Sequence, residues 1–150
     1  MTQNIFEVIK KDGRFSILTK ILERTGIGDT LSNQKGVLTF FAPTDEAFSK
    51  LPKDELERLS GKSGGKLIAD ILGRHIVPNA YFYTEDLRQR DSVEALDGIE
   101  LKIAEKEKML QLEGEPVLTP GILSRNGVIF AVNTVLPYQQ MEAENIQQIH

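Results

Sequence analysis

The first quarter of the chain carries apolar residues at the spacing of short amphipathic helices. Ile5, Val8 and Ile9 fall on one side of a helix that Asn4 can cap, with Glu7 placed to complete a capping box. A second helix is predicted from four apolar residues at helical spacing: Phe15, Leu18, Ile21 and Leu22. It is expected to end at Thr25-Gly26. These segments predict one helical layer that packs against another part of the protein.

The middle of the chain combines short apolar strands with further helices. Residues 37–41 (VLTFF) predict a buried strand that Pro43 stops, and Thr44 is placed to cap the next helix. Helices are then expected over residues 53–59 and 66–74. A glycine- and serine-rich loop is predicted between them, over residues 60–65, and a strand over 75–77 that ends at Pro78.

The second half changes to a period of two, which is typical of half-buried strands. Ile99, Leu101 and Ile103 alternate with polar residues, and a returning strand contains Leu110 and Leu112. A turn is expected at Leu96-Asp97-Gly98, and a solvated turn over residues 105–108. A buried strand follows over residues 128–132, and residues 139–150 are expected to form a tail, either frayed or a short surface helix. Helices before strands predict an α+β fold.

Composition narrows the classes of function. The chain has 150 residues, a formal net charge of −4 and no cysteine. A chain of this length can bury a core without metals or disulfides, and the absence of cysteine excludes thiol catalysis and iron–sulfur clusters. Basic residues form no stripe, so nucleic acid and anionic membranes are not expected partners. No metal and no cofactor are expected, and no apolar run or signal peptide is visible that would insert into a membrane.

Three segments have the residue types of functional sites. Gly61-Lys62-Ser63 resembles the end of a phosphate-binding loop, but Leu56 stands where that loop needs glycine, so a linker is the better interpretation. His75 lies among apolar residues without a nucleophile motif, which favours a hydrogen-bonded structural histidine over a catalytic base. In Tyr81-Phe82-Tyr83, alternation sends both tyrosines to one side; they either pack at the rim of the core or take a sugar or an apolar ligand.

Three motifs, in order, resemble those of the fasciclin-like (FAS1) domain family. Residues 39–48 (TFFAPTDEAF) are similar to its first signature, residues 72–78 (LGRHIVP) to its second and residues 126–137 (NGVIFAVNTVLP) to its last. The residues that carry the resemblance are Thr39, Phe41, Pro43, Thr44, Asp45, Phe48, His75, Pro78, Asn126, Gly127 and Pro137.

The resemblance implies a FAS1-type β-sandwich or wedge with several helices packed against it, and one domain over residues 1–138. It also implies a non-enzymatic adhesion or binding module, expected here as a monomeric, stand-alone bacterial member. The expected location is extracellular, periplasmic or at the cell surface, although the sequence alone leaves the cytoplasm open. The expected partner is a cell-surface or matrix protein or a polysaccharide. The candidate binding residues, taken to be exposed, are Arg74, His75, Asn79, Tyr81 and Tyr83.

The chain departs from the family pattern at three places. Arg74 replaces an aromatic residue, Phe130 replaces a histidine, and Gly121-Ile122 stands where adhesive members often have an acidic residue before isoleucine. The last change makes integrin binding at that position doubtful, because such recognition depends on an acid that completes metal coordination. Phe130 would make one wall of a ligand pocket more apolar than a histidine would. This change favours the alternative function, a carrier of a small apolar ligand.

Overall fold

The computed structural model describes residues 3–33, 35–60 and 65–136. The helices are α1 (Ile5–Lys11), α2 (Ser16–Thr25), α3 (Ile27–Ser32), α4 (Asp45–Ser49), α5 (Lys53–Ser60), α6 (Gly65–His75) and α7 (Thr84–Arg88). The strands are β1 (Leu38–Pro43), β2 (Ile76–Pro78), β3 (Ser92–Glu94), β4 (Glu100–Lys106), β5 (Met109–Leu112), β6 (Glu115–Pro116), β7 (Ile122–Leu123) and β8 (Gly127–Val132).

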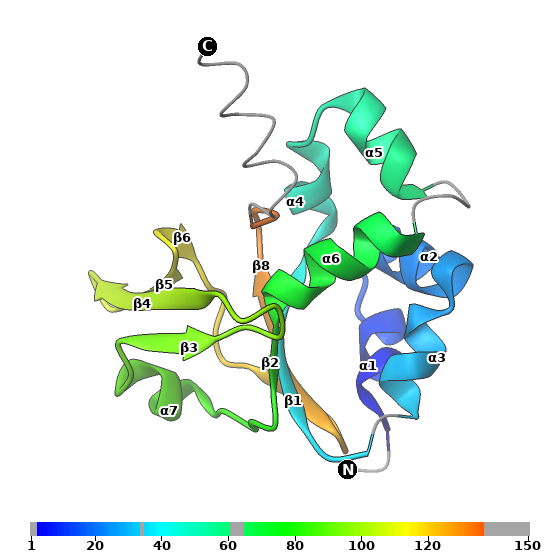
Figure 1. The fold of residues 1–150 in the computed structure, drawn as a ribbon. Coiled ribbons are helices and arrows are strands. Elements are labelled where there is room, and N and C mark those ends of the chain that lie inside the picture. The colour runs from blue at the N-terminus through cyan, green and yellow to red at the C-terminus, as the bar shows by residue number, and fades with distance from the viewer. Residues whose placement is uncertain (1–2, 34, 61–64, 137–150) are drawn as a thin grey trace.

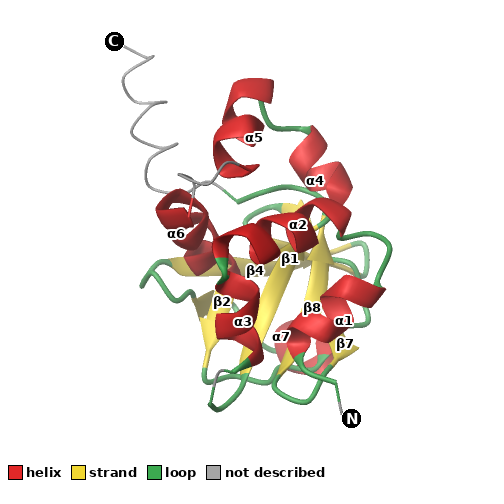
Figure 2. Ribbon diagram, turned by 90° about the vertical axis from the view of Figure 1, so that its right-hand side faces the viewer, coloured by secondary structure: helices red, strands yellow, loops and turns green. Residues whose placement is uncertain are grey.

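These elements form three layers (Figure 1). Helices α1, α2, α3 and α6 cover one face of a sheet with the strand order β2-β1-β8-β7. A second sheet, with the order β3-β4-β5-β6, and helix α7 lie on the other side. Figure 2 shows the helical layer in front of β1 and β8. This arrangement confirms the predicted α+β sandwich with helices packed against it.

The two central strands are buried on both faces, which explains their continuous apolar sequence. Strands β1 and β8 run parallel, with Phe40 opposite Ile129 and Phe41 opposite Phe130. Phe40 and Ile129 pack with the helices. Phe41 and Phe130 pack with the second sheet, and their rings stack with centroids 5.8 Å apart. Alternate residues of one pair of strands therefore supply both cores of the molecule.

Several sequence predictions are confirmed. Asn4 and Glu7 form the predicted capping box at α1, and the Thr44 hydroxyl accepts a hydrogen bond from the Ala47 N–H at the start of α4. The predicted hairpin joins β4 to β5. Its turn is tighter than expected, because only Glu107 and Lys108 lie between the strands and both have positive φ angles.

Other predictions were wrong or incomplete. His75 ends helix α6 rather than beginning the strand, which starts at Ile76. Helix α3 was missed because Gly26, in a left-handed conformation, both ends α2 and begins the next helix. Helix α7 was missed because an aromatic residue, Tyr83, precedes it; the Asp86 carboxylate accepts a hydrogen bond from the Tyr83 N–H there. The core of the predicted glycine-rich loop (61–64), Pro137 and the predicted tail (139–150) lie outside the described residues.

An Asn-Gly pair usually marks a turn, whereas the structure places Gly127 inside the core as the first residue of β8. A β-carbon at this position would lie 2.6 Å from the backbone oxygen of Leu38 and 2.9 Å from Cδ1 of Ile5. Neither neighbour has room to move, because β1 is fixed in the sheet and Ile5 is fully buried. Glycine is therefore needed here for close packing rather than for an unusual backbone angle.

We expect Gly127→Ala to lower the free energy of unfolding by about 2 kcal/mol, the usual cost of overpacking a core. Urea denaturation followed by circular dichroism measures this change. Gly13→Ala is the matched control, because a β-carbon at Gly13 meets no atom within 4 Å; it should change stability by less than about 0.5 kcal/mol. Equal stability of both variants would show that the β1–β8 contact tolerates a side chain.

Candidate functional site

The polar residues of the family-like motifs tie distant segments together inside the protein. The Thr39 hydroxyl donates a hydrogen bond to the Ala80 oxygen (2.9 Å) and accepts one from the Phe82 N–H (3.1 Å). The Thr44 hydroxyl donates to Oδ1 of Asn133 (2.7 Å) in addition to capping α4. Both threonines are buried. They join β1 and the start of α4 to segments about 40 and 90 residues further along the chain and are not available to a partner.

Asn126 has the same role between the helical layer and the sheet. Its side-chain oxygen accepts a hydrogen bond from the Ile5 N–H (2.8 Å), and its amide nitrogen donates to the Leu31 oxygen (2.9 Å). Its backbone oxygen accepts from the Leu38 N–H (3.0 Å). One nearly buried residue therefore joins α1, α3 and β1 at the point where β8 begins.

His75 is fully buried and makes two hydrogen bonds with the backbone. Nδ1 lies 2.8 Å from the Ile71 oxygen, which can only accept, so Nδ1 carries the proton. Nε2 accepts from the Leu136 N–H at 3.0 Å. Burial is the largest cause that lowers the pKa of His75 to about 4, and the nearby Arg74 charge lowers it further. The ring is therefore neutral at physiological pH and holds the end of α6 to the segment after β8.

Arg74 is also inside the protein. Its Nε donates to Oδ2 of Asp97 at 2.7 Å, and its side chain is 6% exposed. The Asp97 N–H in turn donates to the Gly73 oxygen. The arginine that replaces a family aromatic residue thus joins the end of α6 to the predicted turn at residues 96–98. The expectation that Arg74 and His75 lie on an exposed surface was wrong, because the end of α6 packs against the 96–98 turn and the segment after β8, and both residues are buried there.

The three other candidate residues lie between β2 and α7. Asn79 is exposed in a turn with a positive φ of 58°. Tyr81 is partly buried; its hydroxyl donates to the Ser124 oxygen (2.8 Å), and burial raises the pKa of that hydroxyl. Tyr83 is 53% exposed and meets the Tyr81 ring edge-on, with centroids 5.7 Å apart. The tyrosines share one side, as alternation predicted, but only Tyr83 presents much of its ring to solvent.

Tyr83 borders an open hollow beside the edge strand β7. The hollow has a volume of about 250 Å³. It is lined by Tyr83, Thr84, Glu85, Pro120, Gly121, Leu123 and Val128. Leu123, which also lines the hollow, is 37% exposed although it is a large apolar residue. An exposed aromatic ring and an exposed leucine that line one apolar hollow are typical of a recognition surface.

Gly121 shapes the floor of this hollow. A β-carbon there would lie 2.7 Å from Cγ1 of Val128 and 2.8 Å from the Phe130 ring, both of which are fully buried. Any side chain would push the chain away from the core. The glycine that stands in place of an acidic residue therefore fits the backbone closely against Phe130, and the surface offers apolar contact there instead of a carboxylate.

The sequence predicted one of the residues that line this surface and did not predict the others. Of the five candidate residues, Tyr83 is the one that lines the hollow. Pro120, Gly121 and Leu123 come from a segment about 40 residues away, and pairing of Ile122 and Leu123 with β8 brings them beside Tyr83. The available signal was the combination of Pro120-Gly121, which marks a turn, with two apolar residues directly after it.

Within residues 3–33, 35–60 and 65–136, no three histidine, cysteine, aspartate or glutamate side chains are grouped to hold a metal ion. Over the same residues, no helix combines the length and hydropathy needed to cross a bilayer.

Two sheets under a helical layer, joined by the buried residues of the three motifs, define a FAS1-type domain. A model of the fasciclin domain family matches residues 13–138, and the chain belongs to this family. The structure is similar to a FAS1 domain pair from the insect cell adhesion molecule Fasciclin I. That similarity has a TM-score of 0.78, covers 93% of this chain and 52% of the other, and has 17% sequence identity, so it shows the fold.

Two relatives differ greatly in length. Transforming growth factor-beta-induced protein ig-h3 of Sus scrofa is 36% identical over 88% of this chain but only 19% of its own length. The chain thus spans about a fifth of that relative. Uncharacterized protein sll1735 of Synechocystis is 32% identical over 89% of this chain and 96% of its own length. The domain therefore occurs both as part of a much longer protein and as almost an entire protein.

Proposed function

We propose that this chain is a non-enzymatic binding module that attaches to a protein or polysaccharide at a cell surface or in a matrix. The observation that carries the proposal is the apolar hollow between Tyr83 and Leu123, on the exposed edge of the sheet. Membership of the fasciclin family supports it, since the family resemblance implies adhesion. The proposed location is outside the cytoplasm, where such a partner is present.

The chemistry of the surface suits recognition rather than catalysis. Tyr83 offers an aromatic face and a hydroxyl, so it can stack on a sugar ring or insert between apolar side chains of a protein. The histidine of the domain, His75, is buried and neutral, with both ring nitrogens bonded to backbone groups. It therefore lacks the access to substrate that a general base requires.

The alternative, a carrier of an apolar ligand near Phe130, has less support. Phe130 is fully buried and stacked on Phe41, so its ring fills the core between the two sheets. The change from the family histidine therefore adds packing and does not enlarge a pocket wall.

We expect Tyr83→Ala to reduce retention of native cells about tenfold on a surface coated with the purified chain, because exposed tyrosines often dominate binding energy. The assay counts cells that remain under flow. Met109→Ala is the matched control, because Met109 is similarly exposed (47%) but lies in the β4–β5 hairpin. Equal retention by both variants, or no retention by the unchanged chain, would contradict the proposal.

A further inference from the structure

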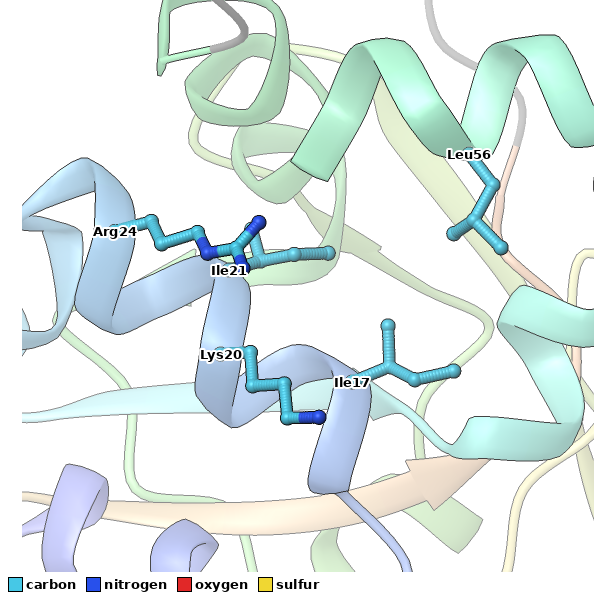
Figure 3. Close-up of a pocket in the computed structure, with 5 residues that line it drawn as sticks. All are labelled: Ile17, Lys20, Ile21, Arg24 and Leu56. Carbon is cyan, nitrogen blue, oxygen red and sulfur yellow. The ribbon is translucent and has the colours of Figure 1, made fainter. Parts of the chain in front are cut away.

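A second concave surface lies in the helical layer, between α2 and α5. Figure 3 shows its lining: Ile17, Lys20, Ile21 and Arg24 on α2, and Leu56 on α5. The groove has a volume of about 140 Å³. Figures 1 and 2 place α2 and α5 away from α7, which begins beside the tyrosine hollow. The two concave surfaces are therefore separate.

The spacing of the lining residues puts them on one side of α2. Positions 17, 20, 21 and 24 follow the intervals of three and four residues that align side chains along a helix. Ile21 is 1% exposed and forms the floor. Ile17 is partly buried, and Leu56 points from α5 toward it. The interior of the groove is therefore apolar.

Its rim is positively charged. Lys20 and Arg24 are exposed and lie one helical turn apart beside the apolar floor. Arg24 also interacts with other residues of the chain, so Lys20 is the cation that we assign to a ligand. Both cations line the groove. Apolar floor and cationic rim together complement an amphiphile with an acyl chain and an anionic head.

We propose that this groove binds a short acyl carboxylate, with the chain between Ile17, Ile21 and Leu56 and the carboxylate at Lys20. A volume of about 140 Å³ is small for a ligand site, so the groove suits a short acyl chain rather than a long one. Hexanoate, a six-carbon acid, is a probe of this kind. This site is independent of the proposed adhesion surface and gives the domain a small-molecule ligand of its own.

Titration of the full chain with sodium hexanoate, followed by amide chemical shifts, tests the proposal. We expect saturable shifts confined to α2 and α5. Butyrate should bind roughly 15-fold more weakly than hexanoate, because each buried methylene contributes about fourfold in affinity. Shifts spread over the surface, or equal affinity for butyrate and hexanoate, would overturn the proposal. Binding to phosphatidylserine vesicles without binding to monomeric hexanoate would overturn it in favour of a membrane surface.

The head-group contact is tested by Lys20→Met, which keeps an apolar stem and removes the charge. We expect this variant to bind hexanoate about tenfold more weakly, while the affinity for 1-hexanol, which has no charge, stays the same. Lys102→Met, on the exposed part of β4, is the matched control and should bind hexanoate like the unchanged chain. An equal loss for hexanoate and hexanol in Lys20→Met, or no loss for either, would overturn the assignment of the carboxylate to Lys20.

Discussion

Lowering the pH from 7 to 4 is expected to reduce the free energy of unfolding by about 3 kcal/mol through His75 alone. In the folded protein, burial keeps this ring neutral and lowers its pKa from 6.5 to about 4. In the unfolded chain the ring takes up a proton near pH 6.5. The contribution is therefore fully present above pH 6.5 and is lost as the pH falls from 6.5 to about 4. Below that pH, both states are protonated and the loss levels off.

The hydrogen bonds explain why the folded state resists the proton. Nε2 already accepts from the Leu136 N–H, so a proton on that nitrogen would face another donor at 3.0 Å. The positive Arg74 side chain beside the ring opposes a second charge, while Asp97 favours it more weakly. Protonation of the folded protein therefore breaks the hydrogen bond between His75 and Leu136, which joins α6 to the segment after β8.

Urea denaturation at several pH values measures this effect. A comparison with a variant that lacks His75 removes the contribution of the carboxylates, because they titrate in both proteins. Unfolding free energies of His75→Gln are subtracted from those of the unchanged chain, and the difference should fall by about 3 kcal/mol between pH 7 and 4. Gln89→Ala, at an exposed helix end, is the control and should keep the full pH dependence. A difference that is flat with pH would show that His75 titrates normally in the folded state.

Asn126→Ala is expected to lower the free energy of unfolding by about 3 kcal/mol. The change leaves the Ile5 N–H and the Leu31 oxygen without their partner, and each buried unsatisfied group costs about 1–3 kcal/mol. The effect should be seen as a lower urea midpoint with an unchanged slope. Gln89→Ala, at an exposed helix end, is the control and should change stability by less than about 0.5 kcal/mol.

Asn126→Asp separates the two hydrogen bonds of this side chain. A carboxylate still accepts from the Ile5 N–H but cannot donate to the Leu31 oxygen. Because the buried charge would face the Leu31 oxygen, we expect a loss of stability at pH 7 at least as large as that of Asn126→Ala. Asn126→Ala with the stability of the unchanged chain would contradict the structural role assigned to the closing motif.

Local patterns in the sequence predicted much of the fold. The capping box of α1, the cap at Thr44 and the buried strands depend on neighbouring residues, so a single segment contains the information. Helix α3 was missed because Gly26 is normally a stop signal, and only the packing of α1 against α3 shows that the chain turns back into a helix.

The candidate site was harder to predict because it is built from two distant segments. Tyr83 was found from its local sequence, whereas Leu123 comes beside it only through the pairing of β7 with β8. Arg74 and His75 were misplaced for a related reason. Polar residues beside a proline-ended strand suggest a surface, and only the tertiary structure shows that α6 turns both side chains inward.

The family-like motifs hold the domain together, and the Tyr83–Leu123 surface is the proposed binding site for the partner. Cell retention and unfolding free energy, measured together for Asn126→Asp and for the double variant Tyr83→Ala with Leu123→Ser, test this most directly. At a temperature where both remain folded, Asn126→Asp should be less stable and retain cells normally. The double variant should retain at least about tenfold fewer cells, while its free energy of unfolding falls by at most about 1 kcal/mol. Normal retention by the double variant, or loss of retention by folded Asn126→Asp, would show that stability and binding are not divided between these two sets of residues.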